Sequence, residues 1–262
     1  MDFFLHVLAG AGVGFAVGLT GVGGGSLMTP LLLLFGYPAP VAVGTDLLYA
    51  ALTKAGGAWS HHRSGNVEWR IVALLATGSI PAAIFLHLFV LDASFQQSPA
   101  FAELLTISLG AMLLITAGIL IWREKLRMGA LQEKPRRLMR LTHQHRSVVT
   151  FIMGIVLGVC VTLSSVGAGA FGAAILLTIY TQISAVRIIG TDIAHAVPLT
   201  LIAGAGYYVA GFVDVELLFG LLVGSLPAIH LGSMASNRVP DKVLQRLLTI
   251  LLLGLGCYYS FF

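Results

Sequence analysis

Four of the ionisable side chains that fall inside strongly apolar stretches of the sequence could do chemistry: Asp46, Lys54, Asp192 and His195. Ionisable groups at membrane depth mark ion pathways, proton relays or sites for charged substrates. Asp46 and Asp192 each follow a Gly-Thr pair, so one interpretation is an acid in the first turn of a helix that the threonine caps. The other interpretation is a pair of acids that serve proton coupling or gating.

Lys54 and His195 carry the same kind of ambiguity. Lys54 lies roughly 9 Å of helix from the polar end of its segment. It either extends to the interface or offers a point charge to an anionic substrate. His195 follows Asp192 by three residues and shares its helix face. It is either a neutral, locally hydrogen-bonded histidine or a proton relay with Asp192, because histidine titrates near physiological pH.

Two glycine-rich turns, over residues 21–26 and 164–172, carry the other candidates. Their glycines either permit close helix packing or break a helix at membrane depth, so that backbone N–H groups face an anion. The second interpretation, with Lys54 and the Gly-Thr threonines, predicts this substrate-binding set: Thr20, Gly21, Gly23, Gly24, Gly25, Ser26, Thr45, Lys54, Ser164, Ser165, Gly167, Gly169 and Thr191. No cofactor or metal is expected, because no Cys, His and Asp cluster has metal-ligand spacing.

The elements that position these residues occur twice. Gly44-Thr45-Asp46 returns 146 residues later as Gly190-Thr191-Asp192, and residues 21–82 match 167–228 without a gap. Duplicated apolar halves with glycine-broken segments are typical of membrane transporters. The repeat therefore indicates one site built from two related halves.

Composition indicates a membrane protein with several spans. The chain is 57% hydrophobic and 10% charged, with a mean hydropathy of +0.93, whereas soluble domains carry roughly 25% charged residues. The N-terminal apolar stretch has no positive n-region, so no cleaved signal peptide is expected. A nucleic-acid partner is not expected either, because the basic cluster at 123–147 lacks interleaved aromatic residues.

Apolar runs divide each half into five segments. They are predicted over 3–20, 24–36, 41–60, 70–90 and 103–122, then over 148–165, 170–182, 188–209, 216–234 and 246–262. The second segment of each half is shorter than the roughly 17–25 residues of a span. The predicted fold is therefore an all-α, polytopic membrane protein with two inverted repeats, each beginning with a short or re-entrant Gly-turn hairpin. Its parts are the repeats 1–122 and 148–262 and the linker 123–147.

The distribution of charge predicts the side that each loop faces. The 123–147 loop holds eight of the fifteen Lys and Arg residues, and the positive-inside rule places it in the cytoplasm. Alternating spans then put the 65–68 loop inside and its copy at 211–214 outside, which inverts one half relative to the other. Both termini are predicted to be periplasmic. Inverted repeats place a substrate site near the midplane, between the halves.

In this order, several motifs resemble the sulfite exporter TauE/SafE family. They are the Gly-Val-Gly-Gly-Gly turn, Pro30, Gly44-Thr45, Gly65-Asn66-Val67 and Gly78-Ser79-Ile80-Pro81. The resemblance implies a permease of the bacterial inner membrane, usually an exporter, for small sulfur-containing anions. Where the family often has a small polar residue after Gly-Thr, this chain has Asp46 and Asp192.

We therefore expect a secondary transporter, not an enzyme, that exports a sulfite-, thiosulfate- or organosulfonate-like oxyanion by alternating access. Its expected partners are the small anion and the lipid bilayer, with a homo-oligomer left open. A passive anion channel is the alternative within transport. A membrane-embedded enzyme is the alternative from another class, and it would have to use Asp192, His195 and Ser164 or Ser165.

Overall fold

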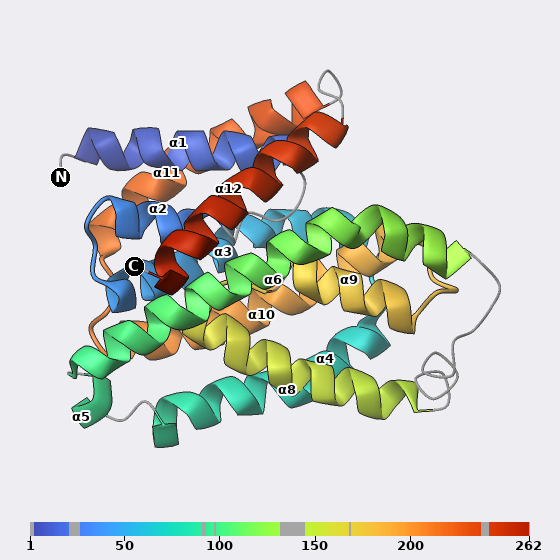
Figure 1. Cartoon of the computed structure of the whole chain (residues 1–262), viewed down its shortest axis with the longest axis horizontal. Coiled ribbons are helices and arrows are strands. Elements are labelled where there is room, and N and C mark those ends of the chain that lie inside the picture. The colour runs from blue at the N-terminus through green and yellow to red at the C-terminus, as the bar shows by residue number, and fades with distance from the viewer. Residues whose placement is uncertain are drawn as a thin grey trace.

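The computed structural model describes residues 3–20, 27–90, 93–96, 98–131, 145–167, 169–236 and 241–261. Throughout these ranges the regular structure is helical (Figure 1), which confirms the predicted all-α class. The elements are α1 (Phe3–Thr20), α2 (Met28–Leu34), α3 (Ala39–Arg63), α4 (Trp69–Phe85), the π-helix η1 (Leu86–Val90), α5 (Ala93–Gln96), α6 (Pro99–Leu131), α8 (Arg146–Ser164), α9 (Ala170–Ile179), α10 (Ala185–Val209), α11 (Val215–Ser236) and α12 (Asp241–Phe261).

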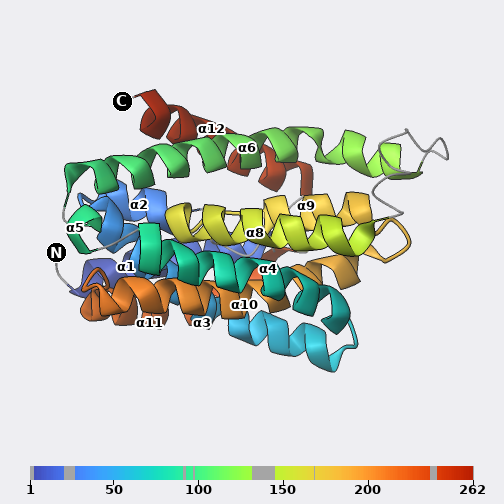
Figure 2. The same cartoon turned by 90° about the horizontal axis from the view of Figure 1, so that it is seen from below.

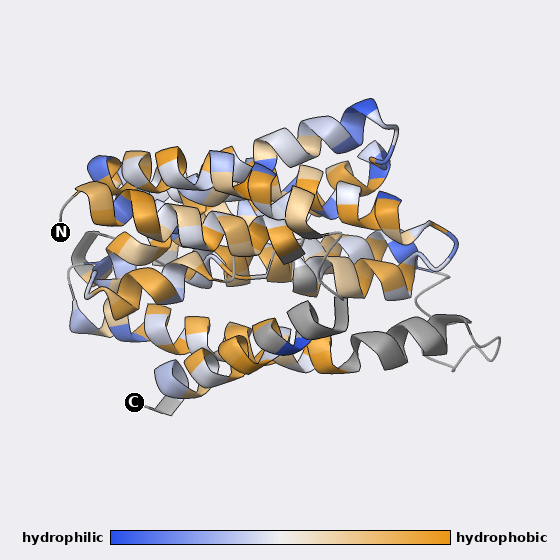
Figure 3. Ribbon diagram, turned by 90° about the horizontal axis from the view of Figure 1, so that it is seen from above, coloured by the Kyte–Doolittle hydropathy of each residue, from blue (hydrophilic) through white to orange (hydrophobic). Residues whose placement is uncertain are grey.

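Five of the described helical stretches are long and apolar enough to cross a membrane. They are Trp69–Phe89, Pro99–Ile121, Arg146–Ser164, Ala185–Val209 and Val215–Ala235, and two shorter apolar helices cover Phe3–Leu19 and Leu248–Ser260. In Figure 3 the apolar residues cover the long flanks, and hydrophilic residues gather toward the two ends. The chain is a multi-pass membrane protein.

Glycine allows two pairs of helices to pack backbone against backbone. Helix α1 lies along α11, and α4 lies along α8, so each pair combines one helix from each half. A Cβ atom at the contact glycines would meet the backbone of the partner helix. The corresponding contacts are Gly10 with Leu221, Gly14 with Ser225, Gly154 with Leu75 and Gly158 with Ser79. The contact partners in α11 and α4 are 146 residues apart, so the packing repeats along with the sequence.

The central pair is formed by α3 and α10, which begin and end in similar ways. Pro40 stands in the first turn of α3, where a missing N–H costs no helical hydrogen bond. Helix α3 ends before Gly65, whose φ is +69°, and α10 ends before Gly211, whose φ is +80°. In both places the two residues after the helix donate back to its last turn, as in a Schellman motif.

The starts of these two helices correct one prediction. Segments were expected to begin near 41 and 188, but α3 begins at Ala39 and α10 at Ala185. Asp46 and Asp192 are therefore each the eighth residue of a helix and lie two turns inside it. The interpretation of these acids as first-turn residues capped by Thr45 and Thr191 is wrong.

The second helix of each half is short, as predicted. Helix α2 has seven residues and α9 has ten, against predicted segments at 24–36 and 170–182. At 1.5 Å per residue they are about 10 and 15 Å long, too short to cross a bilayer. Figures 1 and 2 place α2 and α9 toward opposite ends of the molecule.

The basic linker is shorter than the sequence indicated. Helix α6 was expected to end at 122, but it continues to Leu131 through the first nine residues of the predicted linker. Residues 132–144 lie outside the described part of the chain. Figure 1 places both termini at the end of the molecule opposite the close of α6 and the start of α8. This arrangement is consistent with the predicted topology, while the inversion of the halves across a bilayer stays a prediction.

Candidate functional site

The α3–α10 pair brings together the four ionisable residues that the sequence singled out. The two helices run antiparallel, since Gly44 approaches the backbone of Phe212, and Gly190 approaches that of Asn66 and the ring of His61. Both helices are largely enclosed by the rest of the bundle. The side chains that they bury include Asp46, Lys54, Asp192 and His195.

The carboxyl of Asp46 is held at the start of α2. Its Oδ2 atom accepts a hydrogen bond from the backbone N–H of Thr29, at 3.2 Å, and another from the Thr29 hydroxyl. The Ser165 hydroxyl of the other half also acts on this carboxyl. The second oxygen, Oδ1, has no hydrogen-bond partner within the described residues. Asp46 thus contacts Ser165 of the other half, and its Oδ1 atom has no partner among the described residues.

The carboxyl of Asp192 occupies the corresponding place at the start of α9. The backbone N–H of Gly169 donates to it, and Gly172 contacts its Oδ1 so closely that a Cβ there would overlap the oxygen. Among the described residues this Oδ1 also lacks a hydrogen-bond partner. Each short helix therefore begins beside a carboxylate. The N-termini of these helices were predicted to face a substrate anion. In the structure a carboxyl group of the protein lies at each of them.

Lys54 is a buried cation between the two acids. Its side chain is 6% exposed, so it lies within the bundle and does not extend to the polar end. Its ammonium group interacts electrostatically with Asp192 and with Asp46. Along α3 it is about 12 Å from Asp46, while Gly57, one turn further, faces the Ile193 side chain next to Asp192. The positive charge of Lys54 is therefore shared between two carboxyl groups.

The second glycine turn is a genuine break between α8 and α9. Ser165 adopts a left-handed conformation with φ of +56°, and Gly167 and Gly169 have φ values of +129° and +134°. Such values favour glycine because a Cβ atom is strained there. The Ser164 hydroxyl bonds to carbonyl oxygens near the turn, whereas the Ser165 hydroxyl faces Asp46. The turn thus brings the Ser165 hydroxyl beside Asp46.

The first glycine turn, over residues 21–26, lies outside the described part of the chain. Thr20 is the last residue of α1, and nothing further is described for its side chain. The other predicted members of this turn lie outside the described residues: Gly21, Gly23, Gly24, Gly25 and Ser26. Their role as an anion cradle stays a prediction.

Two contacts between the halves connect the central pair to its neighbours. Ser79 on α4 has its Oγ 2.8 Å from Nε2 of His195. Ser225 on α11 lies near the hydroxyl of Tyr49 on α3, and this hydroxyl has no hydrogen-bond partner among the described residues. Ser225 stands 146 residues after Ser79, and His195 stands 146 residues after Tyr49, so the contacts are counterparts. Neither Ser79 nor Ser225 was predicted as a site residue, although the repeated Gly-Ser-Xaa-Pro motif contains both.

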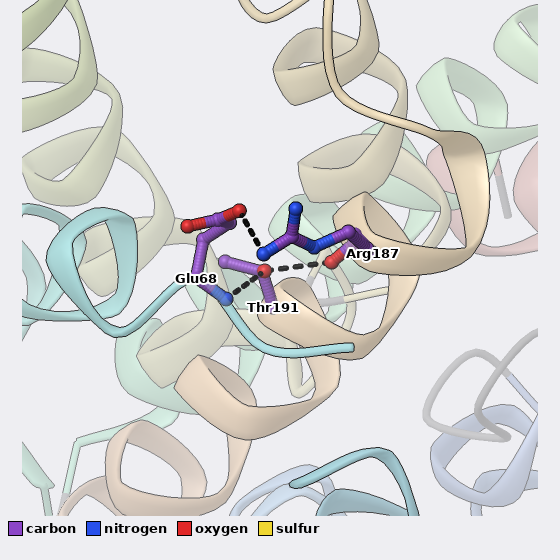
Figure 4. A network of polar contacts seen from close by, with 3 residues as sticks. All are labelled: Glu68, Arg187 and Thr191. Carbon is purple, nitrogen blue, oxygen red and sulfur yellow. Dashed lines mark hydrogen bonds and ion pairs between the residues drawn. The ribbon is translucent and has the colours of Figure 1, made fainter. Parts of the chain in front are cut away.

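The threonines of the two Gly-Thr pairs tie down loops at opposite ends of the α3–α10 pair. The backbone N–H of Asp214 donates to Thr45 at 3.3 Å, and that of Glu68 donates to Thr191 at 2.9 Å. At the second end an ion pair of 2.6 Å joins Glu68 to Arg187 (Figure 4). The substrate role predicted for both threonines stays a prediction, since their hydroxyls already hold these loops.

Several buried polar atoms in this region have no hydrogen-bond partner within the described residues. They are Oδ1 of Asp46, the hydroxyl of Tyr49, Oδ1 of Asp192, Oγ of Ser165 and Nδ1 of His195. Leaving a buried donor or acceptor unsatisfied costs about 1–3 kcal/mol. The Ser165 hydroxyl and the buried ammonium group of Lys54 can donate to the oxygens of a small anion, whereas the two carboxylate oxygens only accept and call for a proton or another donor. No group of three His, Cys, Asp or Glu in the described ranges could hold a metal ion.

Comparison with known proteins shows the family of the chain. Residues 6–259 match the family Sulfite exporter TauE/SafE. Two relatives from Bacillus subtilis are named probable membrane transporter proteins: YjnA is 37% identical over 95% of this chain and 96% of its own, and YdhB is 31% identical over 89% and 90%. A Xylella fastidiosa protein with the same description is 26% identical over 97% and 94%. No solved structure matches. The chain belongs to the sulfite exporter TauE/SafE family of membrane transporters.

Proposed function

We propose that this protein exports a small sulfur-containing oxyanion, of the sulfite, thiosulfate or organosulfonate kind, across the bacterial inner membrane by alternating access. The observation that carries the proposal is the burial of Lys54 between Asp46 and Asp192 in the central helix pair. A buried charge persists only when other charges and hydrogen bonds compensate it. A transported anion can supply that compensation in part of the cycle.

The polar groups around Lys54 favour a compact oxyanion. An ammonium group and hydroxyl groups donate charge-assisted hydrogen bonds to sulfur oxygens. The Ser165 hydroxyl, which lies beside Asp46, donates to the anion in this proposal when the Asp46 carboxyl does not take its proton. Asp46 and Asp192 stand on either side of Lys54 and belong to different halves. In this proposal they serve proton coupling or gating, together with His195.

The repeated contacts support alternating access. Thr45 with Asp214 closes one end of the central pair, and Thr191 with Glu68 closes the other. Loosening one closure while the other holds would open the site to one side at a time. The buried central site is hard to reconcile with a continuously open channel. We place the loop after α6 in the cytoplasm and both termini in the periplasm, following the positive-inside rule.

Export needs no nucleotide in this scheme. A divalent anion that leaves a cell with a negative interior is favoured by about 2.3 kcal/mol per charge per 100 mV of membrane potential. The membrane potential and the concentration gradient of the anion can therefore drive the cycle.

Flux from proteoliposomes tests this function and the role of Lys54. Sulfite, thiosulfate, sulfate and a short sulfonate are each loaded at one concentration, and saturable efflux is expected for at least one of them. Lys54→Gln should reduce that efflux by roughly a hundredfold, because a buried charge contact to a ligand contributes about 2–5 kcal/mol.

The matched control for Lys54 is Thr200→Ala, because Thr200 is the residue 146 positions after Lys54 and its hydroxyl bonds within its own helix. This variant should transport nearly as wild type. If none of the four anions moves, the proposed substrate class is wrong. Equal rates for Lys54→Gln and wild type at equal protein abundance would remove Lys54 from the site.

A further inference from the structure

The two contacts between Ser79 and His195, and between Ser225 and Tyr49, are equivalent in position but not in chemistry. Each joins the Gly-Ser-Xaa-Pro helix of one half to the central helix of the other half. Histidine gains and loses a proton near physiological pH, whereas the tyrosine phenol does not. Of the two contacts, the one with histidine can therefore take up a proton once an anion lies beside the buried ring.

The two nitrogens of His195 have different surroundings. Nε2 is held by the Ser79 hydroxyl at 2.8 Å. Nδ1 is buried and has no hydrogen-bond partner among the described residues, in a side chain that is 0% exposed. Because Ser79 fixes one nitrogen, the orientation of the ring and the place of the free nitrogen are fixed as well.

The charged groups around His195 come from two helices. Lys54 on α3 acts on its ring electrostatically, and Asp192 lies one turn earlier on α10, on the same helix face. From α4 the contact is the uncharged Ser79 hydroxyl. A second positive charge beside Lys54 is unfavourable in a buried site unless an anion lies close to both.

We propose that Ser79 is a positioning residue for His195, which it holds so that Nδ1 takes up a proton when an anion binds at Lys54. This inference rests on the proposed function and deepens it. The proton comes from water on the side to which the site is open, it binds the lone pair of Nδ1, and it returns to water on the other side as the anion leaves. A divalent anion and one proton then move together, with one net negative charge.

The contact between Tyr49 and Ser225 provides the comparison. It has the same place in the other half, and its phenol keeps its proton in the neutral range. Ser225→Ala should therefore leave the pH dependence of transport as it is in wild type, whereas Ser79→Ala should remove it. Both variants remove a serine hydroxyl at equivalent positions of the two halves. A difference in the pH dependence of their efflux is therefore due to the partner residue, His195 or Tyr49.

Thiosulfate efflux from proteoliposomes at internal pH values from 6 to 8 tests the inference. Thiosulfate stays divalent over this range, so any pH dependence belongs to the protein. Wild-type efflux should rise toward acid pH by at least about fivefold, the low end of typical coupling between two ligands. Ser79→Ala and His195→Gln should be slower and independent of pH, and Ser79→Thr, which restores the hydroxyl, should recover the pH dependence. Thermal unfolding of each purified variant shows whether it is folded.

The outcomes separate this inference from the proposed function. A wild-type efflux that does not depend on pH, or a Ser79→Ala profile that follows wild type, overturns the role of Ser79 and leaves the transport function in place. An equal loss of pH dependence in Ser225→Ala overturns the assignment to one contact. Absence of efflux for every anion in wild-type protein counts against the proposed function, and against this inference with it.

Discussion

The contact between Gly172 and Asp192 shows how one missing side chain shapes the site. A Cβ atom at Gly172 would overlap Oδ1 of Asp192, which is one of the buried atoms without a partner. The glycine therefore gives the carboxylate the space to lie at the start of α9, near the N–H of Gly169. In the sequence Gly172 is one glycine of the 164–172 turn, and only its neighbour in space reveals its use.

Gly172→Ala should impair transport while the protein still folds. The added methyl group has to displace the Asp192 carboxylate, and a displacement of roughly 1 Å in a preorganised site lowers rates by about a hundredfold. Anion efflux from proteoliposomes measures the effect. Gly118→Ala is the matched control, because a Cβ at Gly118 meets nothing within 4 Å. Efflux from Gly172→Ala at the wild-type rate would show that the position of the carboxylate is unimportant.

At the scale of elements, the loops at the two ends of the central pair differ in one ion pair. Asp214 accepts a hydrogen bond from Leu217 N–H in the first turn of α11, at 2.9 Å, so it caps its own helix. Glu68 precedes α4 without capping it and extends to Arg187 on α10. The residue 146 positions before Arg187 is Val41, so the other end has no matching cation. The Glu68 end is therefore held by an additional contact between the halves.

Glu68→Gln should loosen that end with little loss of stability. The side chains of Arg187 and Glu68 are 46% and 28% exposed, respectively. Exposed ion pairs contribute about 0.2–1 kcal/mol to the free energy of unfolding. The reporter is a cysteine at Ala58, which packs beside Val67 under the same loop, in a background without Cys160 and Cys257. Alkylation of this cysteine should be faster when Glu68 is replaced. The control Asp214→Asn changes the opposite end of the central pair. If it increases the alkylation rate of the cysteine at position 58 as much as Glu68→Gln does, the ion pair does not hold its own end locally.

The whole molecule has two polar ends separated by an apolar flank, as Figure 3 shows. The basic sequence 123–147 and the 65–68 loop are predicted to share the cytoplasmic end. The close of α10, at Val209, is predicted to face the periplasm. The packing of α1 with α11 and of α4 with α8 joins the halves, so neither half is expected to fold as an independent unit.

Cysteine labelling in whole cells tests this orientation. In a cysteine-free background, Val209→Cys should react with a membrane-impermeant maleimide in intact cells, because Val209 is 86% exposed at the end of α10. Ser64→Cys lies in the exposed loop after α3 and should react only after the membrane is opened. The reverse pattern would invert the topology and with it the proposed direction of export.

Local properties of the sequence were enough to predict the class of the protein and its ionisable candidates. Hydropathy depends on local composition, so the apolar segments that contain Asp46, Lys54, Asp192 and His195 follow from it, whereas the burial of these side chains is shown by the structure. The ends of helices were harder. Helix α6 continues past the predicted end at 122 because Arg, Glu, Lys, Leu and Ala are strong helix formers, and hydropathy does not measure helix propensity. Helix α3 begins before Gly-Thr because the Ala39-Pro40 pair already suits a first turn.

The sequence by itself determined that the chain is a helical membrane protein with two related halves, since repetition and apolar runs are visible along one dimension. Only the tertiary structure decided which groups meet. Ser79 contacts His195 across 116 residues of sequence, and the Ser165 turn of one half faces Asp46 of the other. Such contacts arise because glycines let particular helix faces approach each other closely. The residue pattern of a single helix does not indicate which other helix it will pack against.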